Sequence, residues 1–363
     1  MLFWRSFTHF IGGMGVLVFV MAIIPSVSER SIHILRAEMP GPTVDKIVPR
    51  ATDTAKLLYI IYIGLTALEI CVLYFGKVFG VGSMPLFDSV IHSFGTAGTG
   101  GFSMKSASIA AYSAYDQWVI GVFMLLFGVN FNVFYLLLIK RSLSAFKSSE
   151  LWVYFSIVFG AMSLISINTL SASQTTSKTI RDSFFQVSSI ISTTGYSTTD
   201  FDLWPTLSKT ILLLLMIIGA CGGSTAGGIK VSRVIMIFKI IKRKLKSLIH
   251  PRVVKNISVD GKPVDEGTVS AVAIYTVVYF VLVVLIMFVL AFEKNFDIES
   301  NLSATLACFN NIGPGLAKVG PTLNYSLYGP VSKIVLSVAM LFGRLEIFPI
   351  LLFLIPSSWR RVR

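Results

Sequence analysis

Three short segments, each followed by a glycine-containing loop, most constrain what this chain can fold into. The segments are 86–95, 182–191 and 300–309, and the loops after them read TAGTGGF, ISTTGYS and NNIGPGL. Apolar stretches of about ten residues are typical of re-entrant or buried helices, because a membrane span needs about twenty residues. Polar residues near their starts, Asp88, Asp182 and Asn301, suit helix N-termini, where backbone N–H groups need acceptors. We therefore expect three short helices that dip toward one place.

The loops themselves indicate a cation filter. Glycine allows the backbone to turn carbonyl groups toward an axis, and such carbonyls replace the hydration shell of a cation in the Thr-Val-Gly-Tyr-Gly filters of potassium channels. The C-terminal ends of the three short helices would point partial negative charge at the same place. A single Ser/Thr/Gly run is usually an ordinary turn, so the prediction depends on the repetition.

Composition places the chain in a membrane. It is 54% hydrophobic and only 13% charged over 363 residues, which excludes an ordinary soluble domain. The formal net charge of +13 could suggest a nucleic-acid partner, but the basic residues gather at helix ends and in the loops 140–147, 239–255 and 360–363. These loops all fall opposite the filters, and the positive-inside rule makes that side cytoplasmic. We therefore expect membrane lipid, and no nucleic acid, around the chain.

Cysteine and histidine spacing points to no covalent or metal chemistry. The three cysteines have no paired spacing and the four histidines form no ligand motif, so we expect neither a disulfide framework nor a metal centre. No group of residues indicates acid/base or nucleophilic catalysis. The sequence predicts a protein that is not an enzyme.

The long apolar segments repeat one pattern of outward helix, short helix, filter loop and returning helix. The outward and returning helices are expected at 57–75 and 118–139, at 151–170 and 209 onward, and at 269–292 and 331–355. This divides the chain into a second unit (51–148), a third unit (149–268) and a fourth unit (269–363). Residues 1–25 form one more apolar helix, which fits the returning helix of an incomplete first unit within 1–50. The expected fold class is an all-α integral membrane protein with pseudo-fourfold, potassium-channel-like repeats.

A filter of this design needs four loops, and only three are encoded. The sequence therefore predicts either that the chain is truncated at its N-terminus or that it works in an unusual way.

A glycine-rich stretch interrupts the returning helix of the third unit. Residues 219–230 read GACGGSTAGGIK, with apolar helical sequence on both sides. Non-helical backbone at membrane depth is tolerated only inside protein or along a water-filled cavity, so we expect this stretch in the pathway, below the filter. A phosphate-binding loop is disfavoured because Ile229 stands where that motif needs lysine. A simple helix kink is the remaining alternative.

Charged residues inside the last helix are candidate functional groups. Arg344 and Glu346 lie within 331–355, and a charge at mid-bilayer costs roughly 2.5 to 3.5 kcal/mol on insertion scales. Residues two apart on a helix point in different directions, which argues against a direct ion pair. We expect Arg344 to face the pathway, hold carbonyls of the glycine-rich stretch and repel a passing cation. For Glu69, Asn130 and Asn132, packing and ion contact are equal alternatives.

Motifs throughout the chain resemble one family. They are Phe3-Trp4-Arg5 with 12–15 (GGMG), 36–42 (RAEMPGP), 97–103 (AGTGGFS), 192–196 (STTGY), 222–230 (GGSTAGGIK), 310–315 (NNIGPG) and 343–348 (GRLEIF). With them the chain resembles the Trk/Ktr/HKT superfamily of potassium transporters, most closely its TrkH type. The family's first filter and the helices before it are absent from the sequence.

The resemblance implies a pore with K⁺ as the transported ion and no bound prosthetic group. The filter glycines would be Gly100, Gly195 and Gly313, with carbonyl donors just before each. The implied filter set is Gly98, Thr99, Gly100, Thr193, Thr194, Gly195, Asn311, Ile312 and Gly313. The implied gate is an intramembrane loop opposed by Arg344, formed by Gly222, Gly223, Ser224, Thr225, Ala226, Gly227, Gly228 and Lys230.

The resemblance also implies partners and a location. Family members form homodimers that sit on a cytosolic ring of nucleotide-binding regulatory subunits (TrkA/KtrA-like), and the expected location is the bacterial cytoplasmic (inner) membrane. The expected function is potassium uptake by permeation through the filter and past the gate. Two alternatives stay open, namely Na⁺- or H⁺-coupled symport, for which Glu69 is the only hint of a proton route, and a non-conducting anchor for the regulatory subunit.

Overall fold

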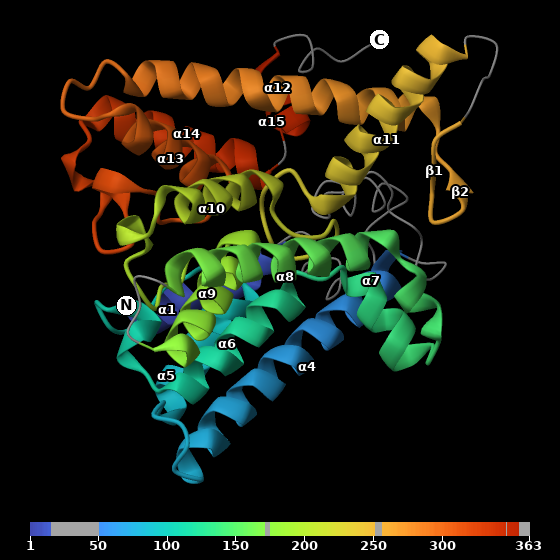
Figure 1. Cartoon of the computed structure of the whole chain (residues 1–363). Helices are drawn as coiled ribbons and strands as arrows, with labels where there is room; N and C mark the ends of the chain where they lie inside the picture. The colour runs from blue at the N-terminus through green and yellow to red at the C-terminus, as the bar shows by residue number, and fades with distance from the viewer. Residues whose placement is uncertain (16–50, 171–174, 251–255, 346, 356–363) are drawn as a thin grey trace.

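The computed structural model describes residues 1–15, 51–170, 175–250, 256–345 and 347–355. The described chain is helical apart from one short hairpin, β1 (Ser258–Val259) and β2 (Lys262–Pro263), which confirms the all-α prediction (Figure 1). The longest helices are α4 (Ala51–Val78), α8 (Ser149–Thr169) and α12 (Glu266–Leu290). Each is long and apolar enough to cross a membrane.

The remaining helices are shorter and lie before, between and after these spans. They are α1 (Leu2–Gly13), α5 (Leu86–Ala97), α6 (Ala114–Phe127), α7 (Phe131–Phe134), α9 (Thr176–Ile191), α10 (Thr206–Ile218), α11 (Val231–Ile249), α13 (Ile298–Phe309), α14 (Pro330–Arg344) and α15 (Ile347–Leu354). A π-helical turn, Tyr135–Ile139, follows α7, and single 3₁₀ turns lie at Ser108–Ala111, Leu143–Lys147, Phe201–Leu203, Ala317–Val319 and Tyr325–Leu327.

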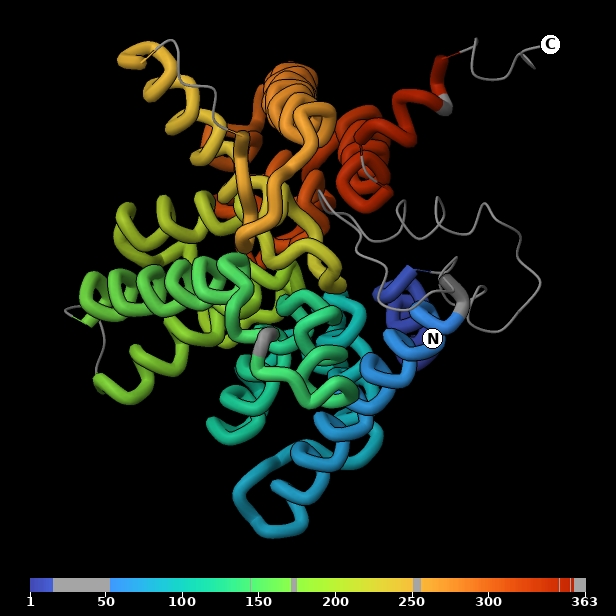
Figure 2. Tube along the Cα trace, turned by 90° about the vertical axis from the view of Figure 1, so that its right-hand side faces the viewer, coloured from blue at the N-terminus to red at the C-terminus, as the bar shows by residue number. Residues whose placement is uncertain are grey.

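The units follow one another around a centre. In Figure 2 the second, third and fourth units succeed each other around the molecule, and α1 lies beside the start of the second unit. One packing rule repeats between them. The returning helix of each unit packs on the short helix of the next, as α1 on α5, α6 on α9, and α10 on α13. The short helices α5, α9 and α13 thus converge from three sides.

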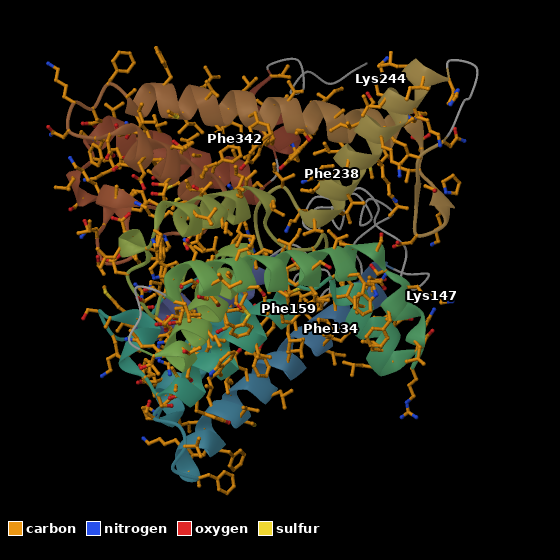
Figure 3. The ribbon with its side chains drawn as sticks, in the orientation of Figure 1. Phe134, Lys147, Phe159, Phe238, Lys244 and Phe342 are labelled. Atoms are coloured by element: carbon orange, nitrogen blue, oxygen red, sulfur yellow. The ribbon has the colours of Figure 1, made fainter. Side chains whose placement is uncertain are left out.

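The long helices expose apolar side chains on their outer faces. Ile60 of α4 and Val284 and Phe288 of α12 are each more than 60% exposed. Exposed apolar faces on helices of spanning length are what a lipid environment requires, since the backbone polar groups are already satisfied within the helix. Lys147 and Lys244 both lie toward the right in Figure 3, Lys244 near the top and Lys147 well below it, and we call this side of the molecule the basic end.

Two predicted spans are not continuous helices. The expected helix 118–139 breaks after Phe127, and α7 with its π-helical turn leaves α6 at an angle of 95°. The expected helix 331–355 breaks at Leu345, between α14 and α15. The first helix, expected over 1–25, ends at Gly13, and residues 16–25 lie outside the described residues. The returning helices of the second, third and fourth units are thus interrupted, whereas the sequence pattern indicated only the break after Ile218.

Two of the short helices, α9 and α13, begin earlier than predicted, whereas α5 begins at Leu86 as expected. The helix α9 starts at Thr176, six residues earlier than expected, so Asp182 lies inside it and accepts a hydrogen bond from Thr198. The N-terminus of α13 is capped by Asp297, not Asn301, which instead accepts from the Tyr328 hydroxyl. Asp88 lies in the first turn of α5 and accepts from Tyr112. These polar residues therefore tie the short helices to outer loops.

Candidate ion pathway

The three predicted filter loops share one backbone conformation. Each short helix ends in a residue with a helical C-cap turn, the next residue has a left-handed backbone, and a glycine with positive φ follows two residues later. The left-handed residues are Thr99 (φ 54°), Thr193 (φ 56°) and Asn311 (φ 55°), and the glycines are Gly101 (φ 63°), Gly195 (φ 84°) and Gly313 (φ 109°). Three different sequences adopt the same turn, so the repeat is structural.

Hydrogen bonds confirm this equivalence. In each loop, the residue between the two positive-φ positions donates its N–H to a carbonyl five residues earlier. These bonds are Gly100 to Gly95 (2.7 Å), Thr194 to Ser189 (2.9 Å) and Ile312 to Ala307 (2.8 Å). They close each short helix with a wide final turn.

The register of the first loop differs by one residue from the expectation. Gly101, not Gly100, is the residue that corresponds to Gly195 and Gly313. The sequence offered two adjacent glycines there, and only backbone geometry distinguishes them. The correction moves the predicted set in this loop from 98–100 to 99–101.

Two of the three filter glycines lie against a carbonyl of the next loop. A Cβ added to Gly101 would collide with the carbonyl oxygen of Thr194, and one added to Gly195 would collide with that of Ile312. A Cβ at Gly313 would meet no described atom within 4 Å. The loops are thus consecutive neighbours around one axis, and the arc that they form is open beside Gly313 among the described residues.

Buried side chains behind the loops fix their positions. Tyr196 is fully buried, and its hydroxyl donates to the carbonyls of His92 (3.1 Å) and Phe102 (3.3 Å) in the second unit. The Ser189 hydroxyl donates to the Tyr196 carbonyl at 2.6 Å. Loop 192–197 is therefore fastened to its neighbour as well as to its own helix.

The glycine-rich stretch is an excursion inserted into a nearly continuous helix. The N–H groups of Ile229, Lys230 and Val231 bond the carbonyls of Ile217, Ile218 and Ala220 at 3.2, 2.9 and 2.9 Å. The chain thus leaves α10 and rejoins at α11 almost where it left. Glycine is required at Gly219 and Gly228, which have φ of 68° and 80° and pack against each other. A simple kink would not need this geometry.

The excursion lies directly beneath the filter loops. The Thr193 hydroxyl oxygen accepts from the Gly227 N–H at 2.7 Å, and the Thr99 hydroxyl donates to the Thr225 carbonyl at 3.1 Å. A Cβ at Gly227 would collide with the carbonyl of Asn310. The stretch is therefore in contact with all three loops.

Arg344 connects three parts of the molecule. It ends α14, and its guanidinium donates to the carbonyls of Thr225 (2.9 Å), Gly12 (2.7 Å) and Gly13 (2.9 Å). The expected proximity to the glycine-rich stretch is present, and the bonds to the C-terminal end of α1 are an addition. Lys230, which is 1% exposed, donates to the carbonyl of Ala226. Two cations thus lie against the same short run of backbone.

These groups line one cavity of about 1140 Å³. Its walls include Thr99, Gly100, Ile312 and Gly313 from the filter loops, residues 224–228 and Arg344. His9 of α1 also lines the cavity, with its ring 5.5 Å from that of Phe102. The sequence did not single out His9, because a lone histidine on an apolar helix carries no motif.

Other candidate residues lie outside the cavity. Asn130 caps α7 and stands against Gly223, so it supports the glycine-rich stretch, and its side chain accepts from the N–H of Asn132 at 2.9 Å. Glu69 is fully buried in α4, and neither carboxylate oxygen has a hydrogen-bond partner among the described residues. Glu346 lies outside the described residues.

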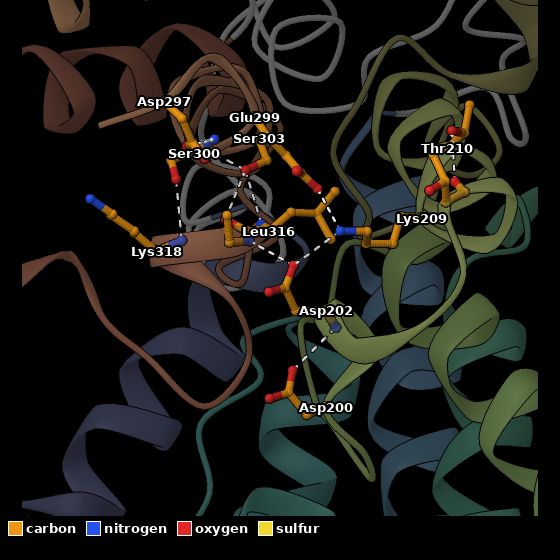
Figure 4. A network of polar contacts seen from close by, with 12 residues as sticks. Asp200, Asp202, Lys209, Thr210, Asp297, Glu299, Ser300, Ser303, Leu316 and Lys318 are labelled. Atoms are coloured by element: carbon orange, nitrogen blue, oxygen red, sulfur yellow. Dashed lines mark hydrogen bonds and ion pairs between the residues drawn. The ribbon is translucent and has the colours of Figure 1, made fainter. Parts of the chain in front are cut away.

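A polar network at the outer end secures the last filter loop (Figure 4). Asp202 accepts from the Ala317 N–H at 2.8 Å, and Lys209 bridges to Glu299 at 2.8 Å. Asp297 caps α13 through the Ser300 N–H at 2.9 Å, and this hydrogen bonding to Ser300 lowers the pKa of the exposed carboxyl group. The network joins the third and fourth units at the outer mouth.

Comparisons with known proteins agree with this architecture. The TrkH family model, described as a cation transport protein, matches residues 1–164 and 146–361. The Trk system potassium uptake protein TrkH of Escherichia coli strain K12 is 36% identical over 99% of this chain and 74% of that protein, and TrkG of the same strain is 32% identical over 99% and 73%.

A solved structure is also similar. The crystal structure of the potassium transporter TrkH from Vibrio parahaemolyticus superimposes with a TM-score of 0.85 at 32% identity, covering 99% of this chain and 73% of that one.

Proposed function

Because the chain belongs to the TrkH family of cation transport proteins, we propose that it carries out potassium uptake across the bacterial cytoplasmic membrane. Membership of this family agrees with the expected multi-pass membrane fold and with the absence of an enzymatic role. The relatives named above are potassium uptake proteins of the Trk system. K⁺ is accordingly the proposed transported ion.

The observation that carries the proposal is the shared conformation of three neighbouring loops, of which the first and the third line the cavity. The carbonyls just before Gly101, Gly195 and Gly313 are the proposed K⁺ ligands, since carbonyl oxygens can replace the hydration shell of the ion. Each comes from one of the proposed units 51–148, 149–268 and 269–363. The C-terminal ends of α5, α9 and α13 add partial negative charge.

The glycine-rich stretch is the proposed gate. It stands beneath the filter, held by hydrogen bonds from Thr99 and to Thr193. Arg344 and Lys230 place positive charge beside it, which opposes a cation in a region of low dielectric constant. Permeation then requires the hydrogen bond between Arg344 and the Thr225 carbonyl to break, so that this segment can move aside.

Regulation and assembly complete the proposal. The relatives belong by name to a Trk system, and the basic end of the bundle, with Lys147 and Lys244, is the proposed docking face for a cytosolic nucleotide-binding ring. The functional unit is proposed to be a homodimer.

Rubidium flux into proteoliposomes tests the proposed function. The chain is compared with Gly195→Ser, whose new side chain would collide with the Ile312 carbonyl, and with Gly160→Ser in α8, where the added atom has open space. We expect selective flux from the parent and from Gly160→Ser, and an altered preference between K⁺ and Na⁺ in Gly195→Ser. Binding of a regulatory ring by a folded protein without flux would instead indicate an anchor.

Proton-coupled uptake is a second candidate, favoured by Glu69. This carboxyl group is fully buried in α4 with no hydrogen-bond partner among the described residues, and an unpaired intramembrane acid is a candidate proton site. Coupled uptake would be driven by a pH gradient alone and would lose that response in Glu69→Gln. Uptake that follows only the K⁺ gradient and the voltage excludes it.

A further inference from the structure

Glu150 contacts the proposed gate at residues that do not line the cavity. It lies in the first turn of α8, and one carboxylate oxygen accepts from the Gly222 N–H at 2.7 Å and from the Ser232 N–H at 3.2 Å. Gly222 lies near the beginning of the glycine-rich stretch, and Ser232 lies just after its end. A single side chain therefore holds both ends of the excursion.

The chemistry of these two donors requires an acceptor. The first N–H groups of a helix have no partner within the helix, and α11, which begins at Val231, has no side-chain cap of its own. The Glu150 carboxylate supplies the missing acceptor from another helix, and its negative charge suits the positive end of the α11 dipole. Hydrogen bonds to a charged group are roughly twice as strong as neutral ones.

The broken returning helix of the second unit also contacts the glycine-rich stretch near Glu150. The Cys221 N–H bonds the carbonyl of Gly128, and the Phe131 N–H bonds that of Gly223, so the broken returning helix of the second unit packs on the same side. Arg344 contacts the stretch at a different residue, Thr225. The gate is thus held between an acid on α8 and a base on α14.

The same turn of α8 is connected to the hairpin at the basic end. The Ser149 N–H donates to Asp260 at 2.9 Å, and Asp260 with Gly261 forms the tight turn between β1 and β2, both at positive φ. Lys239 of α11 donates to the Ser258 carbonyl at 2.7 Å. An unbroken series of contacts therefore runs from the hairpin through Ser149 and Glu150 to Gly222.

We propose that Glu150 is the positioning residue of the gate, which holds the glycine-rich stretch in its blocking position and makes that position sensitive to the hairpin at the cytoplasmic end. The inference rests on the proposed function, because it assigns a role within the same gate. Displacement of the hairpin would pull on the first turn of α8 and withdraw the acceptor from Gly222. A cytosolic partner that binds the hairpin would then favour opening.

Cysteine labelling measures the predicted effect without relying on transport. Cys221 adjoins Gly222 and is 1% exposed. In a Cys71→Ser/Cys308→Ser background it is the only thiol, since the chain has three cysteines. We expect Glu150→Ala to raise the labelling rate of Cys221 by a membrane-permeant maleimide about tenfold or more, because two charge-assisted hydrogen bonds are lost. Glu150→Gln keeps an acceptor oxygen, so its Cys221 labelling rate should lie between that of the parent and that of Glu150→Ala.

Controls separate positioning from general destabilisation. Glu266→Gln removes another first-turn acid, which pairs with Arg243 at the exposed start of α12, and should leave Cys221 labelling unchanged. Asp260→Asn should raise the labelling rate of Cys221 less than Glu150→Ala does, because Asp260 contacts Ser149 and does not contact the glycine-rich stretch directly. Each variant must elute and melt like the parent, and Glu150→Gln decides the question if the alanine variant does not fold.

Uptake provides the second measurement. We expect Glu150→Ala to raise basal Rb⁺ flux severalfold while the preference for K⁺ over Na⁺ stays unchanged, since the filter loops are untouched. Parent-like labelling of Cys221 in folded Glu150→Ala and Glu150→Gln would overturn the inference. Raised labelling without any flux from the parent protein would leave the positioning role standing and count against the proposed function instead.

Discussion

At the scale of single residues, Arg344 is the clearest case of a charge whose position explains its presence. Its guanidinium donates to the carbonyls of Thr225, Gly12 and Gly13, so an intramembrane cation that is costly to bury is satisfied by backbone acceptors. The carbonyls of Gly12 and Gly13 end α1, where the helix dipole favours a positive group. Removing the charge should therefore affect both stability and conduction.

We predict that Arg344→Gln raises basal Rb⁺ uptake severalfold. The substitution removes a positive charge that repels the permeating cation, and it removes a hydrogen bond from Arg344 to the glycine-rich stretch. The melting temperature should also fall, since carbonyls lose charged donors worth about 1.5–3 kcal/mol per bond. The matched control is Arg243→Gln, which removes an arginine from an exposed pair with Glu266. Unchanged uptake in a folded Arg344→Gln protein would contradict the assigned role.

Asp297 carries a residue-scale prediction about pH. Its carboxylate caps α13 through Ser300, and its pKa is lowered in the fold. A lowered folded pKa means that the stabilisation is present above the unfolded value, near 3.9, and is lost as the pH falls through the folded pKa. Asp297→Ala should cost about 1 kcal/mol at neutral pH. The melting temperatures of parent and variant should approach each other as the pH falls below about 4 and through the folded pKa. A difference that stays constant with pH would show that the Asp297 charge is not the source of the stabilisation.

At the scale of elements, the filter loops show that backbone conformation defines the repeat better than amino-acid identity does. Thr99, Thr193 and Asn311 share a left-handed backbone although asparagine is the only one of these residue types that favours it. The short helices and the wide turns at their ends impose this geometry on each loop. The positive φ two residues later then requires glycine.

The register within the first loop yields a matched pair of variants. Gly101→Ala should alter the preference between K⁺ and Na⁺ and reduce flux strongly, because this glycine has positive φ and lies against the Thr194 carbonyl. Gly100→Ala places its methyl group against the His9 ring and should change selectivity less. Competition of Na⁺ with Rb⁺ uptake measures both. The opposite ranking would restore the register that the sequence favoured.

Sequence reasoning located the elements but missed how they are broken. The long helices, the short helices and the excursion at 219–230 follow from apolar periods and glycine density. The breaks after Phe127 and Arg344 were missed because the sequence there has no glycine-rich run. The backbone groups that the breaks leave without helical partners are satisfied by tertiary contacts, which the sequence does not reveal. Glu150 could not be identified either, since its partners are backbone N–H groups more than seventy residues away.

At the scale of the whole molecule, one packing rule assembles the pathway. Each returning helix packs on the next short helix, so the units advance around the axis and bring their loops and breaks to common levels. The interrupted helices then supply free backbone groups, which bond one another, Arg344 and Glu150 beneath the filter. Family resemblance in the sequence predicted this arrangement, whereas the glycine register, the caps and the support of the gate needed coordinates.

The most direct measurement is anomalous X-ray scattering from crystals of the protein grown in Rb⁺. The account predicts an anomalous peak on the axis bounded by Gly101, Gly195 and Gly313, within coordination distance of the carbonyls just before them, and a weaker peak after Gly195→Ser. It also predicts no peak between Arg344 and Thr225 while the gate is closed. A Rb⁺ ion bound elsewhere, with the filter loops in this conformation and no peak between them, would contradict the central claim.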